Sequence, residues 1–527
     1  MTRAAAVPAP VAGTGWRRRS VALATLCTLM FLTFLDNTVV SVALASIRSD
    51  LHAGVSSLQW VVGAYALTFA AFMLGFGMLG DEFGRKKVML AGAGVYCAGA
   101  AMSALAPSIA VLVAGRAVMG FGAAASEPGT LSMIRQLYAE ERSRNRALGV
   151  WAAVSGLSLA LGPVLGGILV GAWSWRGIFW FDVTFGLAAL AAAALVLPES
   201  ADPRAGRVDV TGTLLGACSL GALVFAVIDG ESAGFTSPAV LALYGVSALA
   251  AAGFVRWEMR TPHPLLDLRF LRVPRFATPN VIAACCYFAT FAIFFFTALY
   301  LAVVAGYSGY RIAAVFAPMT AVMIATSLLA GRLPVVAGAR WLLTAGCLVF
   351  AAGLIATRFA LDPHPGYVPL AAALALAGMG LGACMVPVTS SVLAAVPGER
   401  SGMAASATNT SREIGAVGGV VVLGALVDAE LKSGLISRMT QLHLPQSLQA
   451  LVVQVVETGG AGALALGGGG HGGGGGGSGG GLIGQLLRAG YSAFETALHI
   501  ALYVSAGLLA AAALLAFATL GNTSREA

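Results

Sequence analysis

Two ionisable side chains, Asp36 and Arg116, lie deep inside long apolar stretches of this sequence. Asp36 falls within residues 20–47 and Arg116 within residues 106–133, where the other side chains are mostly apolar. A charge at membrane depth is costly, so such a residue usually faces a partner, a cavity or a transport pathway. A helix buried in a soluble core is the alternative, but the rest of the chain repeats the same apolar pattern.

The depths of these two residues are similar, which would allow them to meet. Measured from the outer ends of their stretches, Asp36 lies about eleven residues in (~16 Å) and Arg116 about eight residues in (~12 Å), at 1.5 Å per helical residue. A carboxylate beside an arginine keeps its charge, whereas apolar isolation favours its neutral form. We therefore hypothesise that Asp36 binds and releases a proton as its distance from Arg116 changes. A static structural ion pair is the alternative.

Glu127 and Glu413 are two further acids inside apolar stretches. Glu127 lies eleven residues beyond Arg116, and Glu413 lies about ten residues into its own stretch. Either acid could titrate or attract a cationic substrate. Because Glu413 directly follows Arg412, a contact between these two at a helix end is the structural alternative.

The composition requires a polytopic membrane protein. The 527 residues are 58% hydrophobic and only 10% charged, whereas a soluble globular chain carries about 25% charged residues. So few charges cannot cover a water-facing surface. The seven cysteines lie in apolar stretches without C-x-x-C spacing, so we expect small core residues and neither a metal site nor a disulfide framework.

Fourteen apolar stretches are long enough to cross a bilayer, since a crossing takes about 20 residues. With the N-terminus inside, the inner segments hold 22 of the 31 lysines and arginines, the outer segments seven and the spans two. This bias predicts a multi-pass protein of the cytoplasmic (inner) membrane with both termini in the cytosol. It also explains the net charge of +8 without a nucleic-acid partner.

Internal similarity divides the chain into two related units. Residues 119–123 (MGFGA) reappear as residues 379–383 (MGLGA), 260 positions later, and two further glycine motifs recur in the same order. We therefore expect spans 1–6 and 9–14 to be related bundles of one orientation, with spans 7 and 8 inserted between them. The predicted units are a cytosolic tail (1–19), an N-terminal six-helix bundle (20–197), two inserted helices with inner loops (198–275), a C-terminal six-helix bundle (276–519) and a cytosolic tail (520–527).

A long external loop, residues 428–490, is expected within the second bundle. Its residues 467–481 are all glycine except His471 and Ser478. Such a composition cannot bury a core and predicts disorder. A lone histidine is no metal site, and no phosphate-binding motif is present.

The inner loop after the second span carries glycines, an acid and basic residues at defined spacing: Gly77, Asp81, Gly84, Arg85 and Lys86. Asp81 could accept hydrogen bonds from a neighbouring helix N-terminus or pair with an arginine, which would latch one conformational state. An ordinary basic loop is the alternative.

This loop resembles the G-x-L-x-D-x-x-G-R-[KR] signature of the major facilitator superfamily. Arg116 and the glycines after it resemble that family's intramembrane arginine motif, and the sequence around Asp36 resembles the acidic motif of its fourteen-span drug/proton antiporter branch. The likeness covers nearly the whole chain. It implies an all-α membrane fold of two parallel six-helix bundles plus two inserted helices. It also implies proton coupling through Asp36, Arg116, Glu127 and Glu413.

The fifth span is similar to the antiporter signature of the same family, in residues Gly156, Gly162, Pro163, Gly166 and Gly167. The proline removes a backbone donor and kinks the helix, and the glycines permit close packing. In an antiporter, such a bent contact could seal against proton leak.

Four more residues are assigned to a substrate cavity: Trp60, Tyr65, Asn409 and Arg412. The chain departs from the family pattern in two places. Asp182 stands where many relatives have asparagine, and Val335 replaces the acid in the second copy of the loop motif. Only the first half is therefore expected to carry the full latch.

These features favour a proton-driven multidrug or antibiotic efflux transporter that works by alternating access. No nucleotide-binding motif is present, so the proton gradient would supply the energy and no cofactor is expected. The substrate would be an amphipathic or cationic small organic compound, and the protein a monomer. A dedicated exporter of one self-made metabolite or siderophore is the alternative. A nutrient symporter is less favoured, and an enzyme is disfavoured because the histidines are scattered.

Overall fold

The computed structural model describes residues 16–138, 140–199, 209–262, 264–330, 334–361, 365–397, 401–441 and 479–521. This part of the chain is helical and contains no strand. Thirteen of its helices are long and apolar enough to cross a membrane, and a bent helix pair raises the number to as many as fourteen. The all-α membrane fold expected from the sequence is therefore confirmed.

The first half of the chain forms a bundle in which the first crossing is broken. The helix that carries Asp36 ends at Val39 and continues as a short 3-10 turn and a second short helix. The elements of this half are α1 (Trp16–Val39), η1 (Val40–Ala43), α2 (Leu44–Leu51), α3 (Val55–Phe83), α4 (Arg85–Ala104), α5 (Ile109–Leu137), α6 (Glu141–Ala172) and α7 (Arg176–Val196).

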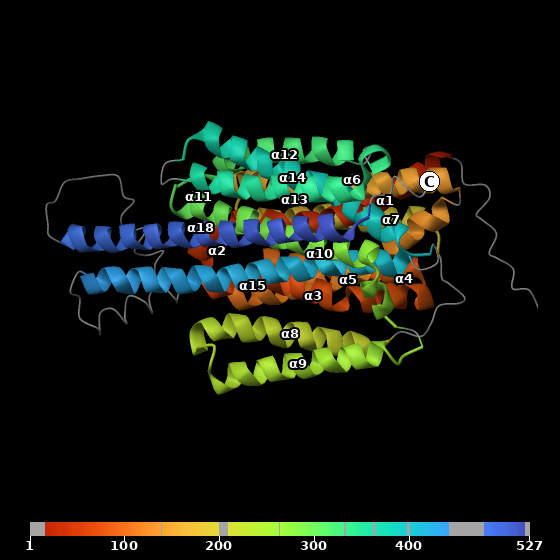
Figure 1. The fold of residues 1–527 in the computed structure, drawn as a ribbon, viewed down its shortest axis with the longest axis horizontal. Helices are drawn as coiled ribbons and strands as arrows, with labels where there is room; N and C mark the ends of the chain where they lie inside the picture. Colours follow the sequence, from red (N-terminus) through yellow and green to blue (C-terminus); the bar gives the residue numbers. More distant parts are fainter. Residues whose placement is uncertain are drawn as a thin grey trace, which may run out of the picture.

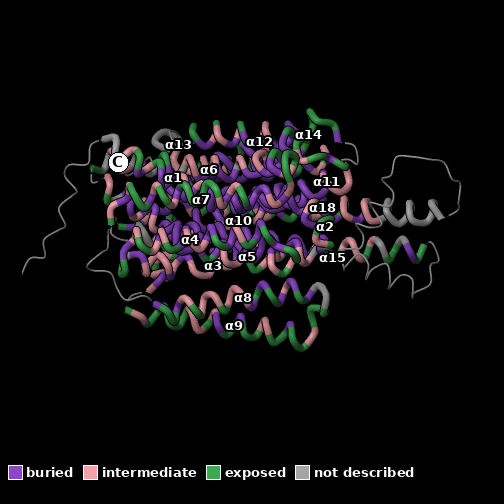
Figure 2. Tube along the Cα trace, turned by 180° about the vertical axis from the view of Figure 1, so that it is seen from behind, coloured by how far each residue is buried: buried purple, intermediate pink, exposed green. Residues whose placement is uncertain are grey.

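The two inserted helices form a separate hairpin. Helices α8 (Val210–Ala233) and α9 (Pro238–Glu258) pack on each other, and α8 also packs on α3 and α15. Figure 1 shows this hairpin along one edge of the bundle. Only 28% of the most apolar window of α8 and 17% of that of α9 is buried, and Figure 2 shows many exposed positions along both helices. Such apolar, exposed helices are suited to contact with lipid.

The second half repeats the bundle with a different irregularity. Its first crossing passes from α10 through a turn of π-helix, η3, into α11. The elements of this half are η2 (Leu268–Arg272), α10 (Pro274–Phe291), η3 (Ala292–Thr297), α11 (Ala298–Val303), α12 (Gly309–Ala330), α13 (Pro334–Ala360), α14 (Tyr367–Ala394), α15 (Ser401–Gln441) and α18 (Gly479–Thr519).

Helices α15 and α18 are 41 residues long each, about 62 Å at 1.5 Å per residue. Both run past the ends of the neighbouring helices (Figure 1). Residues 428–441 and 479–490, the two ends of the predicted external segment 428–490, are therefore helical. Good helix formers and a pair between Asp428 and Lys432 (2.8 Å) support the first of these ends. Residues 442–478, with most of the glycine tract, lie outside the described residues.

The internal repeat is visible in how glycines pack, although with a shift. Gly122 of α5 abuts the backbone of Tyr96 in α4, and Gly380 of α14 abuts the backbone of Phe350 in α13. Because α4 and α13 are the third crossings of their halves, these two glycines correspond. Their separation is 258 positions rather than the 260 that the matching letters indicate. The alignment of identical residues thus differs by two positions from the alignment that the structure supports.

The two halves meet chiefly along two antiparallel helix pairs, α6 with α12 and α3 with α15. Glycines bring both pairs together near each end of the molecule. Gly167 of α6 abuts the Gly309 carbonyl oxygen of α12, and Gly156 lies against Ser327 further along. On the other pair, Gly424 of α15 abuts the Gln59 side chain, and Gly77 of α3 lies 3.4 Å, measured from an added Cβ, from the Ser406 hydroxyl. Neither pair is splayed apart at either end.

Replacing Gly380 by alanine should destabilise the α13–α14 contact. An added Cβ would collide with the backbone nitrogen and Cα of Phe350, and overpacking of this kind costs about 1–3 kcal/mol. We expect a lower melting temperature of the purified protein in detergent. Gly507→Ala in α18 is the control, because nothing lies within 4 Å of its added Cβ. Equal melting temperatures for the two variants would contradict this packing.

Candidate functional site

A fully buried ion pair joins α1 to α5. Arg116 donates from Nη1 to Oδ2 of Asp36 and from Nε to the Val61 carbonyl oxygen at 2.9 Å. Both charged side chains are 0% exposed. Within the described part of the chain, Asp36 Oδ1 and Arg116 Nη2 have no hydrogen-bond partner. The pair therefore keeps one open acceptor and one open donor, which a permanent structural bridge would ordinarily satisfy.

Aromatic rings enclose the guanidinium group of this pair. The Arg116 Cζ lies 4.6 Å from the centroid of the Tyr65 ring and 6.0 Å from that of Phe179, and such faces attract a cation. The Tyr65 hydroxyl donates to the Thr33 carbonyl oxygen at 2.8 Å. Tyr65 was predicted to line the substrate cavity, and in the structure its ring lies against the ion pair.

The bend in α6 lies directly against the end of α1 that carries Asp36. The segments Gly149–Leu159 and Leu161–Ala172 of α6 meet at 45°, as expected one turn before Pro163. Proline has no N–H to offer the carbonyl of Leu159, four residues earlier. The Thr38 hydroxyl of α1 donates to that carbonyl instead, at 2.9 Å. The bend and the acid-bearing helix are therefore joined by one hydrogen bond.

The antiporter-motif glycines divide between the two halves of the molecule. Gly162 abuts Thr38, and Gly166 abuts the Val39 carbonyl oxygen, so both face the last turn of α1. Gly167 and Gly156 face α12 of the other half. A side chain at position 162, 166 or 167 would collide with the neighbouring helix. One bent helix therefore touches both the ion-pair helix and the opposite half.

Two acid–amide hydrogen bonds cross the interface between the halves. Asn37 Nδ2 of α1 donates to Glu413 Oε1 of α15 at 2.9 Å, and Asn409 Nδ2 of α15 donates to Glu127 Oε1 of α5 at 2.9 Å. Each half thus supplies one acid and one amide. All four residues are buried, and the second carboxyl oxygen of each acid has no partner among the described residues. These oxygens are open acceptors at the interface.

Arg412 points away from Glu413. Its Nη1 donates to Asn409 Oδ1 at 3.1 Å and its Nη2 to the Thr389 hydroxyl at 2.8 Å, while its Cζ lies 5.7 Å from the Tyr287 ring centroid. No ion pair joins it to Glu413 in the described part of the structure. The alternative of a helix-end contact between these neighbours is therefore wrong, because successive residues of a helix point in different directions. Arg412 instead orients the Asn409 amide.

The structure places Trp60 against the inserted hairpin. Its ring centroid lies 4.5 Å from that of Phe225 in α8. Trp60 therefore occupies the face of α3 that receives this hairpin, and its role in a substrate cavity stays a prediction. The spacing from Trp60 to Tyr65 could not show this, because five residues turn a helix well past the same face.

The predicted latch loop contacts both halves: Gly77 lies against Ser406 of α15, whereas the described bonds of Lys86 stay within the first half. Gly84 has a φ of +111°, which favours glycine, and links α3 to α4. Lys86 donates from its backbone N–H to Glu199 Oε1 at 3.2 Å and from Nζ to the Ala194 carbonyl oxygen at 2.8 Å. These bonds join α4 to the end of α7. The side chain of Asp81 lies outside what the structure describes, so its proposed role stays a prediction.

Four residues of the site were given no role from the sequence: Asn37, Thr38, Thr389 and Phe179. Asn37 and Thr38 directly follow Asp36, so their place in a polar turn within an apolar stretch was an available signal. Thr389 and Phe179 carried no polar signal of this kind, since single threonines and phenylalanines are common in membrane helices. Only the folded arrangement brings them to an arginine.

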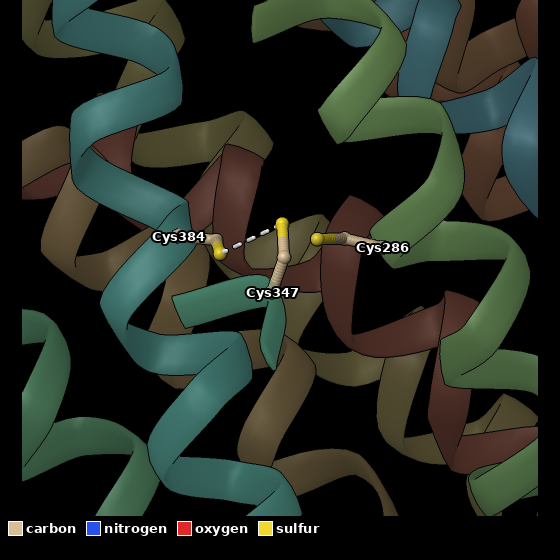
Figure 3. A group of neighbouring side chains, drawn as sticks. All are labelled: Cys286, Cys347 and Cys384. Atoms are coloured by element: carbon tan, nitrogen blue, oxygen red, sulfur yellow. Dashed lines mark hydrogen bonds between the residues drawn. The ribbon is translucent and has the colours of Figure 1, made fainter. Parts of the chain in front are cut away.

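Three cysteines that are distant in sequence converge in the second half. Cys286 of α10, Cys347 of α13 and Cys384 of α14 are buried, and their sulfur atoms all lie within 4.8 Å of one another. Figure 3 shows the sulfur atoms turned toward a common centre, with Cys347 and Cys384 3.8 Å apart. The absence of C-x-x-C spacing in the sequence predicted no metal site, and it could not reveal three cysteines that come together only in the folded chain. Three thiols in this arrangement could hold a thiophilic metal ion.

Comparison with known proteins gives these residues a wider context. The family model described as the Major Facilitator Superfamily matches residues 26–420. The chain is 34% identical over 406 residues to the multidrug resistance protein Stp of Mycobacterium tuberculosis, covering 77% of this chain and 75% of Stp. It is 30% identical over 501 residues to the multidrug efflux pump LfrA of Mycolicibacterium smegmatis, covering 94% of this chain and 95% of LfrA.

A solved structure shares the fold at low identity. It is the inward-facing, unoccupied form of a bacterial homolog of the human lysosomal transporter Spinster. The TM-score is 0.63 at 19% identity, and the match covers 97% of this chain and 100% of that chain.

Replacing Thr38 by valine should destabilise the protein through the bend of α6. The Leu159 carbonyl would lose the Thr38 hydroxyl that stands in for the missing proline N–H, and an unsatisfied buried acceptor costs about 1–3 kcal/mol. In a Pro163→Ala background the restored N–H can bond that carbonyl, so the same substitution should cost much less. Melting temperatures of the four proteins in this double-mutant cycle measure the difference. Thr28→Val, which affects only a bond to Ala24 within α1, is the control, and additive effects would contradict the linkage.

Proposed function

The chain belongs to the major facilitator superfamily, and from this premise we propose that it is a proton-driven exporter of small organic compounds that works by alternating access. The observation that carries this proposal is the buried Asp36–Arg116 ion pair beside the bent helix α6. The names of the relatives, which describe multidrug resistance and efflux, support drug-like substrates. The many apolar helices place the protein in a membrane as a multi-pass protein.

Proton binding at Asp36 would release the arginine. Separating a buried ion pair leaves an uncompensated charge, which costs about 3–5 kcal/mol. A proton on Asp36 removes one of the two charges, so that the pair can separate at lower cost. Arg116 keeps its bond to the Val61 carbonyl and its contact with the Tyr65 ring. Protonation of one carboxyl group would thus free α1 from α5.

The bent helix would carry this local change to the other half. Gly162 and Gly166 contact the turn that follows Asp36, and Gly167 contacts α12. With no side chain to absorb a displacement, movement of α1 displaces the α6 backbone directly. Packed helices move as rigid elements because protein interiors are close-packed. A change at Asp36 would therefore alter the α6–α12 contact and favour a different tilt of the two halves.

The acid–amide bonds at the interface offer a place for the substrate. When the halves tilt, the Asn37–Glu413 and Asn409–Glu127 bonds must break, and each acid then needs another partner. A cationic compound supplies one, because hydrogen bonds to charged groups are stronger than neutral ones. The open oxygens of Glu127 and Glu413 would accept from such a compound. We infer that amphipathic cations are the preferred substrates.

The inferred location is the cytoplasmic membrane, with both termini in the cytosol and the protein acting as a monomer. The excess of lysine and arginine on the side of the N-terminus supports this orientation. No cofactor is needed in this scheme, because the proton gradient supplies the energy.

Replacing Asp36 by asparagine should lower pH-gradient-driven efflux from proteoliposomes at least tenfold, because an amide cannot bind and release a proton. The measurement is efflux of a fluorescent cationic dye after a pH jump. Asp50→Asn is the matched control, since Asp50 pairs with Arg176 at a partly exposed site (2.5 Å, with Asp50 47% exposed), where an ion pair contributes little. Full efflux by the Asp36 variant would overturn the role of this residue.

Replacing Glu413 by glutamine should impair export of cations selectively. The glutamine oxygen can still accept from Asn37, so the interface bond is kept while the negative charge is lost. We expect the apparent KM for monovalent cationic dyes to rise about tenfold, with little change for neutral compounds, when a compound panel is assayed in everted vesicles. Equal losses for both classes would contradict a substrate role. Export of one compound alone from the panel would instead indicate a dedicated exporter.

A further inference from the structure

Asp182 is a second buried acid beside the ion pair. It lies on α7, is 0% exposed, and neither of its oxygens has a donor in hydrogen-bonding geometry within the described ranges. The groups that face it come from four neighbouring helices. They are Tyr96 and Cys97 of α4, Asp36 of α1, Arg116 of α5 and Tyr65 of α3. The Tyr96 hydroxyl donates to the Leu32 carbonyl oxygen in a long bond of 3.5 Å, and it is also close enough to Asp182 to donate to it instead.

Arg116 reaches the face of α7 that carries Asp182. Its guanidinium lies 6.0 Å from the ring of Phe179, three residues before Asp182 and therefore on the same side of the helix. Among the described residues, the Nη2 of Arg116 is a donor without a partner, and the Asp182 oxygens are acceptors without a donor in hydrogen-bonding geometry. Asp182 thus lies one helical turn along α7 from a ring that the guanidinium already contacts.

The charges in this site do not balance unless a proton is bound. Asp36 and Asp182 would together carry two negative charges, while Arg116 is the cation among the groups that face them. A buried carboxylate without a partner is strongly unfavourable. Asp36 already accepts from Arg116. The remaining acid, Asp182, is therefore the one that must hold the proton when this site is neutral.

We propose that Asp182 is a second proton-binding site, and that Arg116 exchanges between Asp36 and Asp182. This inference rests on the proposed proton-driven function and adds a second carrier to it. In the described state Asp36 is charged and paired, and Asp182 carries a proton on one oxygen. When Asp36 binds a proton, Arg116 turns Nη2 toward Asp182, and Asp182 releases its proton. One proton enters and one leaves, so the site stays neutral throughout.

The exchange explains why the ion pair has an open donor. A guanidinium that served one acid alone could satisfy itself with both nitrogens on that acid. Here Nη1 serves Asp36, Nε anchors the group to the Val61 carbonyl, and Nη2 stays available. The Tyr65 ring under the guanidinium would support it in both positions. Asparagine at position 182 could accept a hydrogen bond but could not exchange a proton.

Infrared spectroscopy of the purified protein tests the proposal without substrate or gradient. The C=O stretch of a protonated, buried carboxyl group is resolved from that of a carboxylate. In a Glu127→Gln, Glu413→Gln background at neutral pH, we expect a band of about one carboxyl group, which shifts when the protein is labelled with 13C-aspartate. Asp182→Asn should remove it. Glu258→Gln, at a buried acid in α9, is the control and should leave the labelled-aspartate band unchanged.

Two further variants separate exchange from an isolated neutral acid. In Asp36→Asn, Arg116 has lost its charged partner, so Asp182 should ionise to replace it and the band should vanish. In Arg116→Gln both acids lose their cation, so the band should about double. A band that persists in Asp182→Asn, or that is unchanged in Asp36→Asn, would overturn the inference. The isotope label keeps the test valid in the unsubstituted background if Asp182→Asn fails to fold.

These measurements distinguish a failure of this inference from a failure of the proposed function. If the spectra agree with the exchange but proteoliposomes show no pH-driven efflux, the proton site stands and the exporter proposal fails. If efflux depends on Asp36 but the spectra show no protonated aspartate, the exporter proposal stands and Asp182 is a structural residue.

Discussion

The neutrality of buried charge is the constraint on which the rest of this structure depends. Asp36 and Arg116 are both 0% exposed, and a membrane offers neither of them water. Their pairing is therefore obligatory while both are charged, and it can be broken only when a proton or another partner replaces what is lost. In the proposed mechanism, a single contact between α1 and α5 would thus make the arrangement of the first half dependent on protonation.

The glycines of α6 would transmit a movement of α1 to the other half. At Gly166 and Gly167 the α6 backbone lies directly against the backbone of Val39 on one side and of Gly309 in α12 on the other, and at Gly162 it lies against the short Thr38 side chain. Pro163 bends the helix where the contact begins, and the Thr38 hydroxyl takes the place of the missing N–H. The glycines that allow the helices to pack closely also leave little free space between them. A displacement at the end of α1 has little room to be absorbed before it reaches the other half.

The sequence predicted the fold well and the site in part, and the difference has a physical basis. Long apolar stretches dictate helices, since only backbone groups paired within a segment are tolerated in lipid. Asp36 and Arg116 could be found because a charge in an apolar stretch is rare. Glu413 was found for the same reason, but its partner Asn37 was not, because the contact joins residues 376 positions apart. The convergence of Cys286, Cys347 and Cys384 was hidden in the same way. The contact of Trp60 with Phe225 could not be predicted either, because Phe225 comes from the inserted hairpin, which the repeat could not position.

The acid–amide bonds explain how two halves can be held together without being locked. An ion pair across the interface would resist separation strongly, and an apolar contact would give no directional recognition. An amide donating to a carboxyl group lies between these limits, because only one partner can carry charge. Since each half supplies one acid and one amide, tilting breaks both bonds together and leaves an acid on each face. In the proposed transport cycle, a cation entering between the faces would meet acids on both, and a cation leaving would allow both amides to return. The same four side chains would therefore hold the halves together in one state and favour a charged compound in the other.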